Sequence, residues 1–192
     1  METVPVTAQR FQIRDFQSSD LENLWNIDQE CFPPGISYSR AELRSYLRRR
    51  NSFALVATAN EEAEPFDGTG SSSQAAQPES SSERQAAARS SHRIAGFLVA
   101  EHRHEIGHII TIDVVQRARR YGLGSLLMRA AEDRLLAAGC RAIALETAVD
   151  NSAAIAFYKR HQYCVIGTFP RYYSNGVDAL AFEKQLKIGS HG

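Results

Sequence analysis

The chain has 192 residues, of which 43% are hydrophobic, and its 22 basic side chains balance its 22 acidic ones. This length and composition predict a single domain spanning residues 1–192 with one core. The balanced charge argues against bulk binding of nucleic acid or another polyanion. No stretch reaches the roughly 18 apolar residues of a membrane span, and no apolar signal region opens the sequence. We therefore expect a cytoplasmic protein without a membrane partner.

Three cysteines, Cys31, Cys140 and Cys164, form no C-x-x-C pair and do not stand at metal-ligand spacing with a histidine. This sparse pattern is typical of a reducing compartment and predicts neither a disulfide framework nor a bound metal. Because free thiols most often behave as small apolar groups, we expect all three in the core.

The first part of the chain predicts a strand over residues 11–14 and two helices, over about 20–32 and 39–49. Each helix begins with the pattern of a capping box, Ser19-x-x-Glu22 in the first and Ser39-x-x-Glu42 in the second. Prolines and a glycine directly after the first helix predict its end.

A segment over residues 60–92 separates two β-rich stretches, at 52–59 and 93–101. It consists mainly of Ser, Ala, Glu, Gln and Gly and has almost no large apolar side chain. Such a segment buries too little surface to offset its ordering entropy. We predict a low-complexity, disordered insertion between the second and third strands, with a regulatory or partner-binding arm as the alternative.

The second half alternates strands and helices and predicts a mixed α/β fold. The predicted elements are a strand at 108–114, a helix at 123–138, a strand at 141–146, a helix at 151–161, and a closing strand pair at 164–169 and 177–186.

The turn between the strand at 108–114 and the following helix reads Arg119-x-x-Gly122-x-Gly124. Glycines allow the backbone to bend tightly and to approach a ligand without a Cβ in the way. Amide N–H groups at the positive end of a helix dipole then form a site for an anion such as a pyrophosphate. The alternative is a turn that requires glycine only for its conformation.

A second motif, L-E-x-x-x-x-N-x-A-A-I-x-x-Y, runs from Leu145 to Tyr158. With both motifs in order, the chain from about Phe11 to Leu186 resembles the GNAT superfamily of N-acetyltransferases, and in particular the ribosomal-protein-alanine N-acetyltransferase branch. The resemblance implies a GNAT fold, with a mostly antiparallel mixed sheet flanked by helices. It also implies acetyl-CoA as the co-substrate and no metal. The cofactor-binding residues that it implies are Ile112, Asp113, Val114, Arg119, Arg120, Tyr121, Gly122, Leu123, Gly124, Ser125 and Asn151.

The same resemblance implies Glu146 as the general base and Tyr158 as the acid that protonates the departing thiolate. Independently, strand alternation places Glu146 with two alanines on one face, at the predicted end of its strand. A surface ion pair for Glu146 and a core position for Tyr158 are the alternatives. If the base is elsewhere, Glu101 and Glu105 are the next candidates.

Two aromatic segments resemble the acceptor loops of N-terminal acetyltransferases, and their candidate substrate-binding residues are Phe32, Pro33, Tyr38, Arg171, Tyr172 and Tyr173. They imply a protein or peptide N-terminus as the acceptor, with a ribosomal protein as one candidate. Thr147-Ala148 departs from the branch's usual V-R and leaves a ribosomal acceptor undecided. An enzyme acting on a small amine or a lysine side chain and a non-catalytic acyl-CoA-binding regulator remain alternatives. We expect a monomer or a weak dimer.

Overall fold

The computed structural model describes residues 10–59 and 94–186, so the predicted insertion lies outside the described residues. The described elements are β1 (Phe11–Asp15), η1 (Ser18–Asp20), α2 (Leu21–Cys31), α3 (Arg40–Leu47), β2 (Ser52–Ala59), β3 (Ile94–Arg103), β4 (Ile106–Val114), η2 (Gln116–Ala118), α5 (Leu123–Ala137), β5 (Ala142–Ala148), α6 (Ser152–Arg160), β6 (Cys164–Phe169) and β7 (Ala179–Gln185). The strands form one seven-stranded sheet in the order β1-β2-β3-β4-β5-β7-β6. Only β4 and β5 pair in parallel, which confirms the expected mixed, mostly antiparallel sheet.

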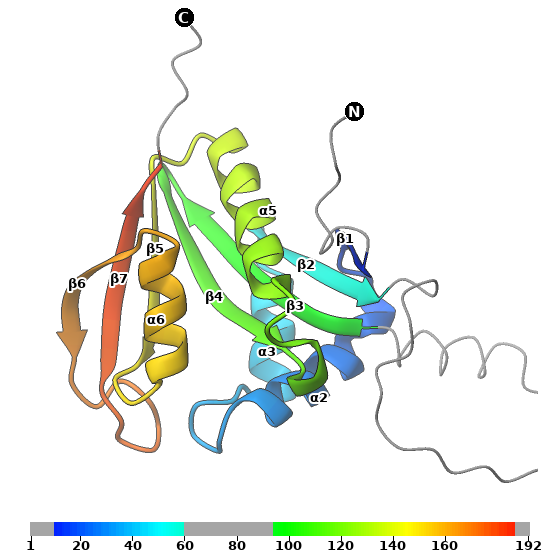
Figure 1. Ribbon diagram of the computed structural model, residues 1–192, viewed down its shortest axis with the longest axis horizontal. Coiled ribbons are helices and arrows are strands. Elements are labelled where there is room, and N and C mark those ends of the chain that lie inside the picture. The colour runs from blue at the N-terminus through cyan, green and yellow to red at the C-terminus, as the bar shows by residue number, and fades with distance from the viewer. Residues whose placement is uncertain (1–9, 60–93, 187–192) are drawn as a thin grey trace, which may run out of the picture.

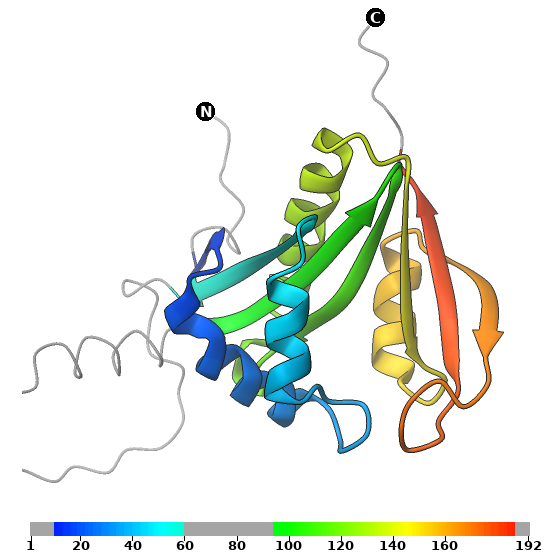
Figure 2. The same ribbon diagram turned by 180° about the vertical axis from the view of Figure 1, so that it is seen from behind.

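Helices cover both faces of the sheet. α5 packs on β2, β3 and β4 from one side, while α2 and α3 pack on β2, β3 and β4 from the other. Figures 1 and 2 show this arrangement, with α6 on the same side as α5. Figure 2 also shows that none of the described helices covers the opposite face of β5, β7 and β6. The buried core lies between α5 and the sheet and between α2 and the sheet.

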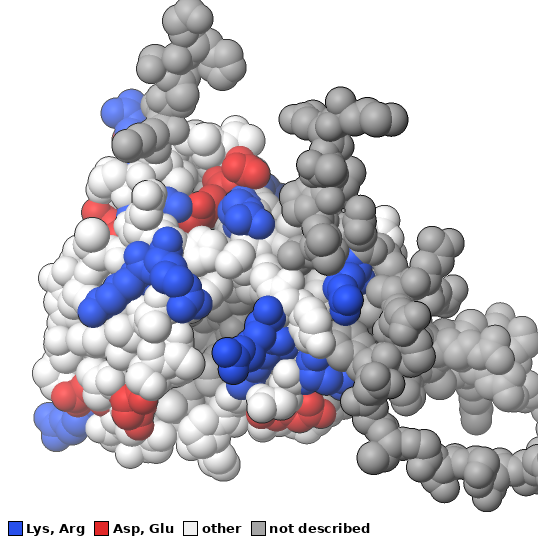
Figure 3. Space-filling view, in the orientation of Figure 1, with Lys and Arg blue, Asp and Glu red and all other residues white. Residues whose placement is uncertain are grey.

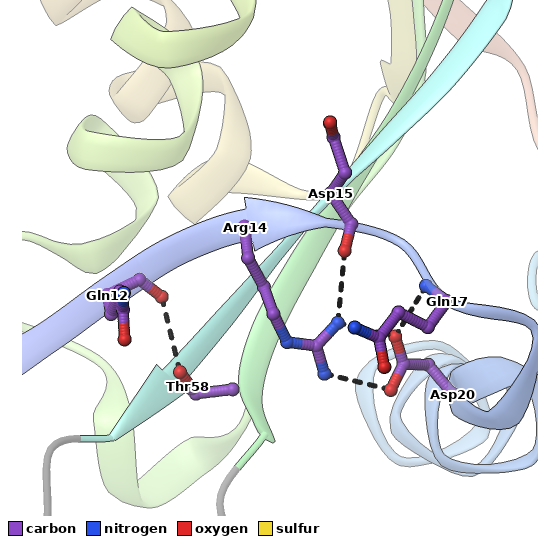
Figure 4. Close-up of polar contacts among 6 residues, drawn as sticks. All are labelled: Gln12, Arg14, Asp15, Gln17, Asp20 and Thr58. Carbon is purple, nitrogen blue, oxygen red and sulfur yellow. Dashed lines mark hydrogen bonds and ion pairs between the residues drawn. The ribbon is translucent and has the colours of Figure 1, made fainter.

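The first predicted capping box is wrong. Asp20, and not Ser19 with Glu22, organises this turn, because Gln17 and Asp20 cap the short 3₁₀ helix reciprocally. Arg14 donates two hydrogen bonds to the Asp20 carboxylate, at 2.6 and 2.9 Å (Figure 4). Glu22 instead forms an exposed ion pair with Arg40. The second capping box, Ser39 with Glu42, is confirmed.

The parallel pair β4–β5 separates partway along its length. Pairing runs from Ile106 opposite Ala142 to Ile109 opposite Leu145, although both strands continue beyond it. A register shift in the β3–β4 ladder leaves Ile110 without a partner on β3, which is a β-bulge. Bulges bend a strand and end its pairing. β4 therefore turns away from β5 here, and a cleft can form between the two strand ends.

Two further details differ from prediction. β5 extends to Ala148, so Glu146 lies within the strand and not at its end. Cys164 is exposed, while Cys31 is half-buried and Cys140 is buried, so only Cys140 is a core thiol as expected. Cys164 is exposed because β6, the strand that carries it, is the outermost strand of the sheet and is exposed along its whole length.

Candidate active site

A cleft of about 840 Å³ opens where β4 and β5 diverge. Its walls come from the end of β4, the β4–α5 loop, the end of β5, α6 and the two loops that follow α2 and β6. Of the expected site residues, those that line it are Phe32, Pro33, Tyr38, Ile112, Val114, Arg119, Arg120, Gly122, Leu123, Gly124, Ser125, Glu146, Asn151, Tyr158 and Tyr173. Four do not line it, namely Asp113, Tyr121, Arg171 and Tyr172.

The glycine turn has the conformation that an anion site needs. Gly122 caps α5 in the left-handed region, with φ of 79°, and no side chain caps the first turn of the helix. The first N–H groups of an α-helix have no partner within the helix. The N–H groups of Leu123, Gly124 and Ser125 are thus available at the cleft wall. Gly124 has a different role from Gly122, since a Cβ there would meet the ring of Phe157 on α6 at 3.3 Å.

The side chain of Arg119 points back to the end of β4. Its Nε donates to the Val114 carbonyl at 2.9 Å, and its guanidinium lies 3.6 Å from the Cys31 sulfur. The Cys31 thiol also lies 3.5 Å from the same carbonyl and donates to it. Burial raises the pKa of Cys31 to about 11, so this thiol stays protonated at neutral pH. Arg119 and Cys31 together hold the backbone at the point where the strand enters the loop.

Asp113 and Tyr121 lie away from the cleft for different reasons. The Asp113 carboxyl is buried on the core face of β4, where it accepts a hydrogen bond from Thr111 at 3.0 Å. Burial, and then the charge of Asp28, raises the pKa of Asp113 well above its ordinary value. Tyr121 is 42% exposed and carries the guanidinium of Arg10 over its ring.

The α6 wall presents Asn151 and Tyr158. The Asn151 side chain caps the helix by accepting a hydrogen bond from the Ala154 amide at 3.1 Å. Tyr158 is 7% exposed, and its ring packs on Tyr163 and Phe182. Burial, followed by the charges of Asp113 and Tyr173, raises the pKa of Tyr158. Its phenol therefore keeps its proton at neutral pH, as an acid must.

Glu146 faces a histidine that the sequence analysis did not select. His108 Nε2 lies 2.7 Å from Glu146 Oε2, with the two side chains 33% and 17% exposed. An ionised carboxylate only accepts hydrogen bonds, so His108 donates to Glu146. The two alternative bases do not line the cleft, and each has an arginine partner elsewhere, Arg49 for Glu101 and Arg141 for Glu105.

The two aromatic loops meet each other at the other end of the cleft. The backbone N–H and the hydroxyl of Ser174 both donate to the Gly35 carbonyl, at 3.2 and 3.1 Å. The Tyr38 hydroxyl donates to the Ile110 carbonyl at 3.2 Å, on the part of β4 that β5 no longer pairs. Tyr172 stacks on Phe169 and packs edge-on against Tyr173.

The loop tyrosines also interact electrostatically with Glu146. Burial, then the charge of Glu146, raises the pKa of Tyr172 to about 12. Arg171 serves the loop's own geometry, since its backbone N–H donates to Asp178 at 2.7 Å and its φ is 51°. Tyr172 thus lies within reach of Glu146 even though it does not line the cleft.

A buried carboxyl fixes the first of these loops. Asp28 on α2 is fully buried and accepts hydrogen bonds from the Tyr38 amide at 2.8 Å and from the Gln29 side chain at 3.0 Å. Burial raises the pKa of Asp28 to about 6. The loop between α2 and α3 is therefore anchored at its far end by a group that titrates close to neutral pH.

Comparison with known proteins decides the family. The model of the acetyltransferase (GNAT) family matches residues 21–163, which is most of the chain. The chain belongs to the acetyltransferase (GNAT) family. This confirms the family that the two motifs indicated.

Relatives and solved structures of GNAT proteins agree with the match. N-alpha-acetyltransferase 30 of Schizosaccharomyces pombe is 38% identical over 76 residues, which is 40% of this chain and 51% of that protein. The ribosomal-protein-S18-alanine N-acetyltransferase of Escherichia coli superposes with a TM-score of 0.70 at 18% identity, over 95% of this chain and 97% of that one. NAA60 of Arabidopsis thaliana, crystallised with acetyl-CoA, superposes with a TM-score of 0.68 at 21% identity, over 92% of this chain and 98% of that one. The alignment with the yeast relative covers about half of that relative's length.

Two further findings concern what this GNAT chain contains. In residues 10–59 and 94–186, no group of three or more His, Cys, Asp or Glu side chains could hold a metal ion. None of the helices in this described part is long and apolar enough to cross a membrane.

His108, which contacts Glu146 without lining the cleft, was not selected by the sequence analysis, and neither was Arg160, which does line it. His108 stands 38 residues before Glu146, and only the parallel register of β4 and β5, which places His108 opposite Ala144, brings the two together. One signal was available, since His108 is a polar residue at the start of an apolar, β-branched strand. Strands of parallel pairs are usually apolar along their length, so a histidine in such a strand, beside the strand that carries Glu146, is a candidate site residue.

Proposed function

We propose that this GNAT enzyme acetylates the α-amino group at a protein or peptide N-terminus, with Glu146 as the base and Tyr158 as the acid. The observation that carries the proposal is the position of Glu146. It lies where the cleft between β4 and β5 meets the two aromatic loops, and it is held by His108. An alkyl ammonium is protonated at neutral pH, so a base near the entering amine is chemically necessary.

Acetyl-CoA would occupy the arm of the cleft between the glycine turn and α6. Free N–H groups in the first turn of α5 would hold the pyrophosphate. The edge of β4 beyond Ile109, which β5 does not pair, offers backbone groups to the pantetheine arm in the manner of an added strand. Asn151 uses its side-chain oxygen as a helix cap, which leaves its amide NH₂ for the cofactor.

The reaction would then proceed by direct attack. Glu146 accepts the proton of the ammonium group, and the hydrogen bond from His108 keeps the carboxylate aimed at it. The amine attacks the thioester carbonyl, and a backbone N–H at Val114 or a close neighbour stabilises the oxyanion. The attacking nitrogen, positively charged after the attack, loses its second proton to solvent. As the tetrahedral intermediate collapses, the C–S bond breaks and the Tyr158 hydroxyl gives its proton to the leaving thiolate, after which Tyr158 regains a proton from solvent. The raised pKa of Tyr158 keeps that proton available until this step.

The acceptor assignment is supported by the walls near Glu146. Phe32, Pro33, Tyr38 and Tyr173 make this end of the cleft apolar and aromatic. In the described part of the chain, Glu146 and Asp150 are the only carboxylates that line the cleft. A polyamine carries several positive charges and needs more acidic partners, whereas a peptide presents one ammonium group on an uncharged backbone. The names of the yeast and bacterial proteins, an N-alpha-acetyltransferase and a ribosomal-protein-alanine N-acetyltransferase, point the same way.

The test compares Glu146→Gln with the wild-type enzyme on peptides that begin with Ala or Ser and on a panel of polyamines and aminoglycosides. We expect turnover on peptides only, reduced about a hundredfold or more in the variant at neutral pH. Higher pH should partly restore the variant, because free amine then forms without the base. The affinity for acetyl-CoA should hardly change.

Glu105→Gln is the matched control, since Glu105 is exposed, pairs with Arg141 and does not line the cleft. It should leave turnover unchanged. Wild-type turnover in Glu146→Gln at neutral pH on the best acceptor would place the base elsewhere. Turnover of polyamines and not of peptides would overturn the acceptor assignment and leave the base assignment standing.

A further inference from the structure

Two arginines from different elements line the cleft. Arg120 comes from the β4–α5 loop and Arg160 from the last turn of α6, and both line the cleft. Neither pairs with a carboxylate of the described residues. By contrast, Arg14, Arg49 and Arg134 elsewhere on the surface each form an ion pair. Figure 3 shows basic side chains on both sides of a hollow on this face.

The backbone conformation of Arg120 is unusual. Its φ is 68°, in the left-handed region. A non-glycine residue pays about 1–2 kcal/mol for this conformation. Such conformations are retained mainly where a functional site requires them. Here the turn delivers the Arg120 side chain to the mouth of the cleft, directly before the glycine turn.

Contacts between α5 and α6 fix the position of Arg160. His161, the next residue, lies with its Nε2 2.8 Å from the Ser125 hydroxyl in the first turn of α5. The His161 ring also packs on Phe157, whose own ring lies against Gly124. The end of α6 is therefore held against the start of α5, and Arg160 lines the same cleft as the first residues of α5.

The charge around His161 identifies this end of α6 as cationic. Burial, with the nearby charges of Lys184, Arg129 and Arg160, lowers the pKa of His161, while Glu132 opposes them. Glu132 already forms an ion pair with Lys184, whose Nζ lies 2.7 Å from Glu132 Oε2. The positive charges of Arg129 and Arg160 have no carboxylate partner among the residues described. An anionic ligand bound here would therefore provide the missing negative charge.

The geometry points to a second anion subsite in the cleft, formed by Arg160 and Arg120, that binds the phosphate on the adenosine ribose of coenzyme A. This inference rests on acetyl-CoA as the co-substrate and adds a requirement for that phosphate. Coenzyme A carries a pyrophosphate and a separate ribose phosphate. The amides at the start of α5 account for the pyrophosphate, and the two arginines remain for the other group. Arginine suits this task because its planar guanidinium donates paired hydrogen bonds to phosphate oxygens.

The experiment measures binding of acetyl-CoA and of acetyl-dephospho-CoA, which lacks the ribose phosphate, by calorimetry on the full chain. A lost charge-assisted contact of this kind corresponds to about a 10- to 100-fold change in affinity. We expect the wild-type protein to prefer acetyl-CoA by that factor. Arg160→Met keeps the apolar length of the side chain, and should weaken acetyl-CoA binding while leaving acetyl-dephospho-CoA binding unchanged.

Lys159→Met is the matched control, because Lys159 is adjacent, exposed and absent from the cleft lining. It should leave both affinities unchanged. Equal wild-type affinity for the two ligands would overturn the subsite without any variant. An equal loss for both ligands in Arg160→Met would overturn it too, since Arg160 would then act on the pyrophosphate or on the fold. Failure to bind either ligand would instead contradict acetyl-CoA as the co-substrate.

Discussion

Gly35 lies at the contact between the two loops that border the proposed acceptor site, and replacing it with alanine should separate them. Its φ of 89° is in the left-handed region, and a Cβ there would meet the Cβ of Asn175 at 2.7 Å and its backbone nitrogen at 3.0 Å. Because one of these atoms is backbone, the clash cannot be relieved by a side-chain rotation. Ser174 donates twice to the Gly35 carbonyl, so displacing Gly35 also weakens these bonds.

The size of the effect follows from two separate contributions. The left-handed conformation costs alanine about 1–2 kcal/mol, and overpacking adds about 1–3 kcal/mol. Gly139→Ala is the matched control, since its φ is 88° but nothing lies within 4 Å of its Cβ. For a domain of this size, each kcal/mol lowers the Tm by about 2–4 °C. We expect the Tm of Gly139→Ala to fall by about 2–8 °C, and the Tm of Gly35→Ala to fall further.

Kinetics separate a local effect on the loops from a general loss of stability. If the loops relieve about 1–3 kcal/mol of clash by moving apart, and peptide binding requires them together, the KM for the peptide should rise about 5- to 150-fold. The KM for acetyl-CoA should stay unchanged, because the glycine turn is at the other end of the cleft. Equal Tm losses in the Gly35 and Gly139 variants, together with an unchanged peptide KM, would refute this reasoning.

Three further outcomes are expected. Tyr158→Phe should lower kcat about a hundredfold with little change in acetyl-CoA affinity, because its proton is needed only as the thiolate departs; an unchanged kcat with chemistry rate-limiting would assign Tyr158 to the core alone. Gly124→Glu should abolish acetyl-CoA binding in calorimetry by placing a carboxylate among the phosphate-binding amides, and normal affinity would show that the cofactor lies elsewhere. The pKa of Asp28, raised to about 6 by burial, exceeds the unfolded value near 3.9, so the folded state holds this proton longer and loses stability as pH rises between the two values. In urea unfolding, the free energy of unfolding of Asp28→Asn should therefore rise by about 2–3 kcal/mol relative to that of the wild type between pH 4 and pH 7. If the two unfolding free energies depend on pH in the same way, the burial argument is contradicted.

Local sequence patterns were sufficient for features that depend on a few neighbouring residues. The capping box of Ser39 with Glu42 and the tight glycine turn at Gly122 both follow from short-range hydrogen bonding and backbone sterics. Where two local solutions compete, the pattern misleads. Asp20 caps its own turn in place of Ser19 because Arg14, on the preceding strand, holds the carboxylate.

The motifs of the glycine turn and of the segment from Leu145 to Tyr158 were also sufficient to recognise the family, since each is a short, continuous run of sequence: the first leads into α5, and the second runs from β5 into α6. Side-chain direction was less certain. Asp113 belongs to the cofactor strand by position, but its carboxyl points into the core because neighbouring residues of a strand face opposite sides.

The tertiary structure alone decided the contacts between distant strands and loops. His108 meets Glu146 through the parallel register of β4 and β5, and Gly35 meets Ser174 because two loops converge over the cleft. The cleft itself exists because β4 bulges at Ile110 and leaves β5. The hydrophobic pattern of a strand decides which of its faces is buried. Which strands become neighbours and where two of them part depends on residues that are distant in the sequence, so no local pattern shows it.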